Sequence, residues 1–527
     1  MWPKSKKNEK NKIEVTDQES FLEDVKQYAT PVVELCHFAL ENHRNKRFPC
    51  RDFLSRLHNE STRLEEHVDH YGAQTNERWF PFRETVAAAK LFSSVIYSVM
   101  HIQHSFARYR LLEVEYDCFA QTERVLKQLK KALITICHNI IDQTKRCDIH
   151  DPHQEPDVKP CEERTISFRL PADRQVRHVA RIGEVVVYLA TQFLNLAEDR
   201  DVNEALAEQE GKSYETHVPE PINEERLRIV EARFHNLQSM YDTYIFESDV
   251  EQQDGNLLFL RGHISVIYHF LATATELVHY YVRHMSSFRR QTEEKLELPM
   301  SNSEILGLLF DYTLRNAQLY LGSAIQLCHT MVQSYSEQTE IEVPIPNYRG
   351  FHVRPSTLIA KIVAHYGSTV KMILNEQEYD AGSPLNLFRA NEEINAMKRR
   401  TIADMISKRP DLDVPAPEDP EERKQRLQLL FVALMNEDKI VIYDTDLSFE
   451  GIEEAPERTV SELATRFIRH YMSIGKLDVE SDLTVMFVGD NRALKDLEIL
   501  ANNGYGEDHM GNNIVLPDEL GYLARQR

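Results

Sequence analysis

Long uninterrupted apolar runs are missing from this sequence. The best membrane-spanning candidate, 264–282, contains His269, Glu276 and His279, whereas a spanning helix needs about 20 predominantly apolar residues. The lysine-rich N-terminus lacks the apolar stretch that follows the basic region of a signal peptide. We therefore expect a buried core helix at 264–282, no membrane insertion and a cytoplasmic location.

Basic side chains are too few to balance the acidic ones. The 527 residues include 62 Lys and Arg against 84 Asp and Glu, a formal net charge of −22 with neutral histidines. Such a surface repels phosphate backbones, so we expect no nucleic-acid partner.

The seven cysteines are odd in number and widely spaced, which is typical of a reducing compartment. Hydrophobic residues, at 42%, suffice for real cores, and the length calls for more than one domain.

The first part of the chain, 20–338, carries apolar residues at helical spacing in segments much longer than strands. In 116–141, for example, Leu126, Leu129 and Leu133 recur every three or four residues. This pattern predicts an all-helical domain of unknown function, built as a bundle of helical hairpins. A flexible tail, 1–19, precedes it.

The residue pattern changes at Thr339 from helical spacing to alternation, and an α+β domain is expected over 339–478. Alternating residues predict its first strand, and Pro355 suits the first turn of the helix that follows. An insert at about 410–436 precedes the last strand, with an acidic, proline-rich linker at 411–421 and a helical stretch at 423–435. Residues 479–527 form an extension without an assigned role. The predicted order is strands at 340–346, 369–374, 377–381 and 439–443, with helices at 355–366, 385–406 and 460–473. A further strand is predicted in the extension at 483–488.

The segment from Arg349 to Ser356 is the sharpest chemical signal. It places His352 between a strand and the start of a helix, where unpaired backbone N–H groups and the positive end of the helix dipole favour a phosphate on the ring. Arg354 can add charge-assisted hydrogen bonds to the same oxygens. Neutral imidazole is a good nucleophile near neutral pH. Alone, so short a motif is more often a loop histidine at a helix end.

This segment resembles HPr, the histidine-containing phosphocarrier family of the bacterial sugar phosphotransferase system. The family motif is Gly, an apolar residue, His, a variable residue, Arg, Pro and a small residue, and Gly350 to Ser356 fits it throughout. The resemblance implies an open-faced β-sandwich whose helices cover one face of an antiparallel sheet. It also implies His352 as phosphoacceptor, Arg354 as its phosphate partner, and Val353, Pro355 and Ser356 as the phosphate-binding helix start.

The same resemblance implies a regulatory position and a docking surface. Counting forward from the motif places Ser383 at the regulatory phosphoserine of Gram-positive members, although Pro384 replaces the usual aliphatic residue. A serine that caps the following helix is an alternative interpretation. Phe351, Leu385 and Phe388 fall in the apolar surface that docks partners.

Cys, His and Glu residues occur in groups that suggest metal binding, but their spacings match no metal-binding module. Four possible zinc donors have unmatched spacing, and Glu-x-x-His pairs of the di-iron type arise by chance among 22 histidines. The zinc-type residues are Cys147, His150, His153 and Cys161. The di-iron-type pairs are Glu34 with His37 and Glu276 with His279, and His67 and His70, with Glu66 adjacent in sequence, form a further pair. We expect neither metal nor cofactor.

The sequence carries no Walker-type loop and no kinase signature, so a partner must supply the phosphate. The resemblance then implies a stoichiometric phosphocarrier, not an enzyme, of a phosphoenolpyruvate-dependent phosphotransferase system. Its donor would be of the enzyme I type, and its acceptor is unknown. Two alternatives stay open: a phosphorylation-sensitive docking protein whose helical domain binds a partner or ligand, and a metal-dependent helical oxidoreductase.

Overall fold

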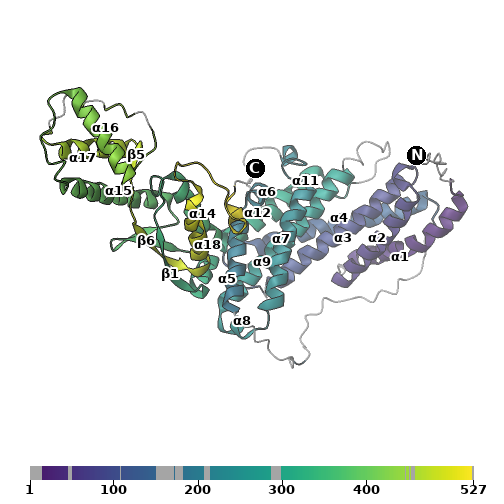
Figure 1. Cartoon of the computed structure of the whole chain (residues 1–527). Coiled ribbons are helices and arrows are strands. Elements are labelled where there is room, and N and C mark those ends of the chain that lie inside the picture. The colour runs from purple at the N-terminus through teal and green to yellow at the C-terminus, as the bar shows by residue number, and fades with distance from the viewer. Residues whose placement is uncertain are drawn as a thin grey trace, which may run out of the picture. The chain divides into compact units, whose positions relative to one another are not determined.

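The computed structural model describes residues 15–44, 50–106, 109–149, 171, 182–206, 214–285, 298–444, 447–449, 452 and 457–524. Two compact units divide the chain (Figure 1). The first comprises residues up to Ile182 together with Leu196–Leu327, and the second comprises Gly183–Asn195 together with Cys328–Arg527. The protein is mostly helical with a small antiparallel sheet, which confirms a helical part and an α+β part.

The first unit is a set of packed helices. α3 packs against both α2 and α4, and α9 packs against α7 and α12. Its long helices are α1 (Gln18–Arg44), α2 (Arg51–His70), α3 (Phe80–Ser105), α4 (Cys118–Arg146), α7 (Glu224–Tyr244) and α9 (Gly255–His279). Shorter helices are α6 (Arg200–Leu206), α8 (Asp249–Gln253), α11 (Asn302–Gly307) and α12 (Arg315–Ser323), with π-helical turns at Tyr280–Met285 and Leu308–Leu314.

Two helical segments of the described chain are long and apolar enough to cross a membrane by length and composition. They are Phe80–Ser105 and Gly255–Met285, and 72% and 67% of their apolar windows are buried. Such burial is what core helices of a bundle show.

A four-stranded sheet organises the second unit. β1 (Gln338–Pro344), β6 (Thr484–Asp490), β2 (Val370–Leu374) and β3 (Gln377–Asp380) lie in that order, and all neighbours are antiparallel. Apolar residues of the strands form one core with those of α14 (Val353–Tyr366), α15 (Pro384–Ser407) and α18 (Asn491–Asn502). In Figure 1, α14 and α18 lie side by side at this sheet.

The strand predicted at 439–443 is confirmed, but its placement as the fourth strand of the sheet was wrong, as was that of the helix at 460–473 as the closing helix of the same unit. β4 (Ile440–Ile442) pairs with β5 (Leu477–Val479) in a separate two-stranded ribbon, and the sheet takes its fourth strand from β6 in the expected extension. Both runs are apolar, and their local pattern does not specify a pairing partner. The insert therefore extends from about the end of α15 to the start of β6.

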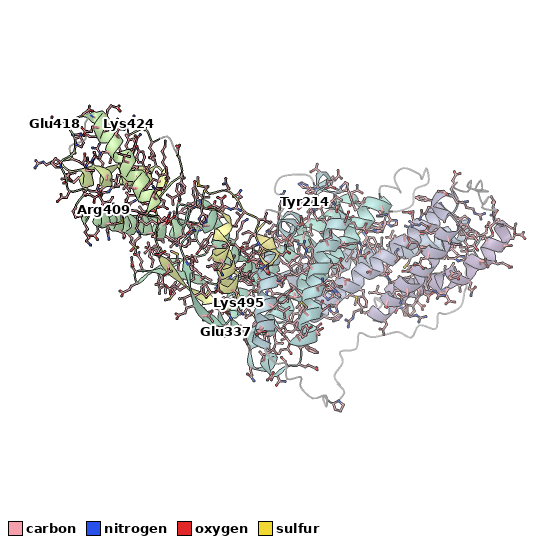
Figure 2. The ribbon with its side chains drawn as sticks, viewed as in Figure 1. Tyr214, Glu337, Arg409, Glu418, Lys424 and Lys495 are labelled. Atoms are coloured by element: carbon pink, nitrogen blue, oxygen red, sulfur yellow. The ribbon has the colours of Figure 1, made fainter. Side chains whose placement is uncertain are left out.

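The insert has a hydrophobic core of its own. It contains α16 (Pro420–Asn436), α17 (Val460–Ser473), β4 and β5, which pack against the second half of α15. A buried ion pair, Lys398 Nζ to Asp478 Oδ2 at 2.9 Å, joins α15 to β5. Charged side chains cover its surface, among them Arg409, Glu418 and Lys424 (Figure 2).

Helix α5 (Ile182–Glu198) was expected in the helical domain, yet most of it belongs to the second unit. Thr191 donates its hydroxyl to the carbonyl of Tyr366, at the end of α14, at 3.1 Å. Arg492 of α18 donates to the same hydroxyl at 3.2 Å. The second unit also takes in α13 (Ile325–Tyr335) from Cys328 onwards, so it begins before the predicted boundary at Thr339.

Candidate functional site

A sharp turn between β1 and α14 presents His352. Arg349 and Gly350 both have positive φ, 54° and 60°. A Cβ on Gly350 would lie 2.1 Å from Oδ1 of Asn391, so glycine is required here on both counts. The buried Asn391 amide of α15 fixes the turn: Oδ1 accepts the Phe351 N–H at 2.9 Å, and Nδ2 donates to the Arg349 carbonyl at 3.0 Å.

Both ring nitrogens of His352 have acceptors. Nδ1 lies 3.0 Å from the Gly350 carbonyl oxygen, and Nε2 lies 3.1 Å from Oε2 of Glu507. A carbonyl and a carboxylate only accept, so a ring with a proton on each nitrogen satisfies both contacts. The Tyr348 ring meets the imidazole edge to face, with centroids 5.3 Å apart. The imidazole is 24% exposed.

Arg354 contacts the same loop that supplies Glu507. Its Nε donates to the carbonyl of Gly506 at 3.2 Å. Tyr505, one residue earlier, is buried and donates its hydroxyl to the Pro344 carbonyl at 2.7 Å. The loop after α18 therefore reaches both residues to which the sequence analysis assigned the phosphate chemistry, although it lies about 150 residues beyond them.

Fewer backbone N–H groups than expected are available for phosphate at the start of α14. α14 begins at Val353, so the N–H of Ser356 already forms the first intrahelical bond, to the His352 carbonyl at 3.2 Å. The Ser356 hydroxyl donates to the Phe351 carbonyl at 2.9 Å, and Pro355 has no N–H. The backbone N–H groups of Val353 and Arg354 have no acceptor among the described residues. These two groups, not Pro355 and Ser356, can hold an anion.

Of the three residues predicted to form a docking surface, one is buried in the core and two are at least partly exposed. Phe351 is 0% exposed and meets Phe487 and Tyr505 edge to face in the core, so its assignment to a docking surface was wrong. The two left-handed residues before it turn its side chain inward. Leu385 is 60% exposed, and Phe388 is partly buried on the same helix.

Ser383 occupies the N-cap position of α15, as the alternative interpretation held. Its side chain makes no capping hydrogen bond. Its carbonyl instead accepts the N–H groups of Asn386 at 3.0 Å and Leu387 at 3.2 Å. The hydroxyl is therefore not committed to the helix start.

The insert packs against the turn that carries His352. The Tyr443 ring lies 4.7 Å from that of Tyr348, and its hydroxyl donates to the Asn347 carbonyl at 3.3 Å. Burial raises the pKa of the Tyr443 phenol, which therefore remains a hydroxyl donor. Arg349 donates to the carbonyl of Gly475, between α17 and β5. The insert therefore packs against the turn and supports it.

Sequence reasoning missed Glu507, Asn391, Tyr348 and Tyr443. None has a local signature, because each acts across the fold on a turn that is distant in sequence. The glycines at 504 and 506, both with positive φ, are the one local sign of a structured loop in the extension.

The described residues contain no group of three or more His, Cys, Asp or Glu side chains placed to hold a metal. Of the zinc-type set, Cys147 is a buried thiol whose pKa burial raises to about 11, and the other three lie outside the described residues. His279 pairs with Glu224 at 2.9 Å. Five cysteines, at 36, 118, 137, 147 and 328, are free thiols, and Cys50 is disulfide-bonded.

Comparison with known proteins adds no relative: no family model, no curated protein and no solved structure matches this chain.

Proposed function

We propose that the chain is a phosphocarrier of a phosphoenolpyruvate-dependent phosphotransferase system in the bacterial cytoplasm, resembling HPr. His352 accepts a phosphoryl group from a donor of the enzyme I type and passes or signals it to a partner protein. The observation that carries the proposal is the partly exposed imidazole at the N-cap of α14, beside the N–H groups of Val353 and Arg354, which have no acceptor among the residues that the structure describes.

The element order supports the proposal. With the insert set aside, the second unit runs β1, α14, β2, β3, α15, β6, α18. This is the β-α-β-β-α-β-α order of the HPr family, although its last strand and helix are β6 and α18 and not the predicted segments at 439–443 and 460–473. The strands alternate buried and exposed residues, and the three helices share the core on the buried side. The motif from Gly350 to Ser356 falls at the start of the first of these helices, where a phosphate would meet the helix N-terminus.

The transfer requires an unprotonated nucleophile. His352 Nδ1 first parts from the Gly350 carbonyl oxygen, 3.0 Å away, and releases its proton to water. Its lone pair then forms the new N–P bond while the P–N bond of the donor breaks. The donor nitrogen keeps that electron pair and takes up a proton from water. The N–H groups of Val353 and Arg354, with the Arg354 guanidinium once it leaves Gly506, stabilise the oxygens of the transferred group.

A second candidate is a docking module that reads phosphorylation without relaying it. The observation in its favour is that both ring nitrogens of His352 and Nε of Arg354 already have acceptors. A docking module keeps its partner after His352→Ala, whereas a carrier loses all phosphate uptake.

The test is intact-mass measurement after incubation of the full chain with phosphoenolpyruvate and enzyme I, under non-acidic conditions. His470→Ala is the matched control, because His470 is an exposed histidine of the same unit. We expect one acid-labile phosphate on the wild type and on the control, and none on His352→Ala. Absence of phosphate on the wild type, with enzyme I from the same organism also tried, would refute the relay.

A further inference from the structure

Glu507 is a carboxylate with no assigned role that faces the nitrogen of His352 opposite the attacking one. Its Oε2 lies 3.1 Å from Nε2, and the carboxylate side chain is only 8% exposed. Water therefore competes little for this contact, and a hydrogen bond to a charged acceptor is strong in such a setting. The imidazole of His352 is itself 24% exposed.

The backbone around Glu507 is ordered by its own hydrogen bonds. The Glu507 N–H donates to the Gly504 carbonyl at 3.2 Å, and the Ile514 N–H donates to the Gly506 carbonyl at 3.1 Å. Glu507 and Asn513 form an antiparallel bridge. The carboxylate is thus held in place by a closed loop, which reduces the entropic cost of keeping it on the ring.

The loop also packs against the turn that carries His352. A Cβ on Gly511 would lie 2.5 Å from the Tyr348 ring, so the loop backbone approaches that ring closely. Tyr348 in turn meets the imidazole edge to face. The loop therefore constrains the ring directly through Glu507 and indirectly through Tyr348.

We propose that Glu507 is the positioning residue of the phosphoacceptor, holding the proton of His352 on Nε2 so that Nδ1 becomes the nucleophile. This inference rests on the proposed function. When Nδ1 has lost its proton to water, the Glu507 carboxylate keeps the remaining proton on Nε2, because moving that proton to Nδ1 would leave the Nε2 lone pair facing the carboxylate. Nδ1 then carries the lone pair that attacks phosphorus.

The same carboxylate stabilises the product. Bond formation at Nδ1 makes the ring a phosphorylated imidazolium, with its proton still on Nε2, while the donor ring departs with the electron pair of the broken P–N bond. The developing positive charge lies against the Glu507 carboxylate, which was in place before the reaction began. The contact is therefore stronger in the transition state than with the neutral ring that attacks, as acceleration of the chemical step requires.

Glu507→Gln tests this inference in the full chain. Glutamine keeps the size of the side chain but loses the charge, and its amide can rotate to donate to Nε2, which favours the wrong tautomer. The matched control is Glu340→Gln, which removes one exposed carboxylate from β1. Phosphorylation is followed at varied enzyme I concentration, which separates the maximal rate constant from the half-saturating donor concentration.

We expect Glu507→Gln to lower the maximal rate constant about 10- to 100-fold, the effect of losing one hydrogen bond to a charged group. The half-saturating donor concentration stays near that of the wild type, and Glu340→Gln matches the wild type in both quantities. Equal maximal rates for Glu507→Gln and the control, or a change confined to donor affinity, would overturn the inference while leaving the carrier function intact.

A second measurement does not depend on the variant folding. ¹⁵N NMR of wild-type protein with labelled histidine, recorded while the ring is neutral, should show the His352 proton on Nε2. A neutral ring with its proton on Nδ1 would overturn the inference. If the wild type accepts no phosphate at all, the proposed function fails and the inference fails with it. If the wild type accepts phosphate and Glu507→Gln reacts equally fast, only the inference fails.

Discussion

Replacing Asn391 with alanine should loosen the turn that carries His352. The change deletes both hydrogen bonds of the amide, to the Phe351 N–H and to the Arg349 carbonyl. Phe351 is fully buried, so its N–H is left without a partner, whereas Arg349 is exposed and its carbonyl can bind water. One orphaned buried donor costs about 1–3 kcal/mol, so we expect a loss of about 2 kcal/mol in the free energy of unfolding.

Denaturant unfolding of the full chain measures this loss, with Asn386→Ala as the matched control. Asn386 lies on the same helix, and its side chain makes no hydrogen bond among the described residues. Because the turn sets the position of the ring, phosphate uptake by His352 should also slow in Asn391→Ala. A variant as stable as the control, with an unchanged rate of uptake, would refute the reasoning about the turn.

Three further predictions concern buried charge, pH and helix capping. Lys398→Met leaves the Asp478 carboxylate buried and unpaired and should cost about 3–5 kcal/mol of unfolding free energy, and adding Asp478→Asn should restore part of it; no recovery would contradict this. Burial lowers the pKa of His269 in the folded protein to about 3, whereas the unfolded histidine has a pKa of about 6.5. The unfolded chain therefore binds a proton at His269 that the folded chain does not, and stability falls as the pH is lowered from about 6.5 towards 3. The stability difference between wild type and His269→Phe in urea should therefore shift by about 2–3 kcal/mol between pH 6.5 and 4.5, and a constant difference would exclude this cause. Ser383→Ala should change stability by less than about 0.5 kcal/mol because the hydroxyl caps nothing, whereas Thr459→Ala breaks a capping box and should cost about 1 kcal/mol; equal losses in thermal unfolding would contradict the assignment.

Local pattern predicted much of the secondary structure of the second unit but missed α18, in a segment expected to be a loop-rich tail. Helical periodicity located α14, α15 and α17 to within a few residues, and Gly367 ends α14 with a positive φ as its glycine suggested. Period-two alternation found the strand at 483–488, which is β6. Such signals arise within a few neighbouring residues and are therefore visible in one sequence.

Pairing and side-chain direction were not predictable in the same way. β4 and β6 are both short apolar runs, and only the completed core decides which one enters the sheet. The inward turn of Phe351 follows from two left-handed residues that no periodicity reveals. Glu507 reaches His352 from about 150 residues away, so the site is assembled by the fold and not by the motif alone.

The central claim is that His352 is the phosphoacceptor, and mapping the phosphate tests it most directly. Wild-type chain incubated with phosphoenolpyruvate and enzyme I should be digested under alkaline conditions and fragmented by mass spectrometry, with the phosphate counted per chain. We predict one phosphate, located on His352. A phosphate on another histidine, or a wild-type chain that stays unmodified beside a carrier protein phosphorylated in the same mixture, would contradict the account.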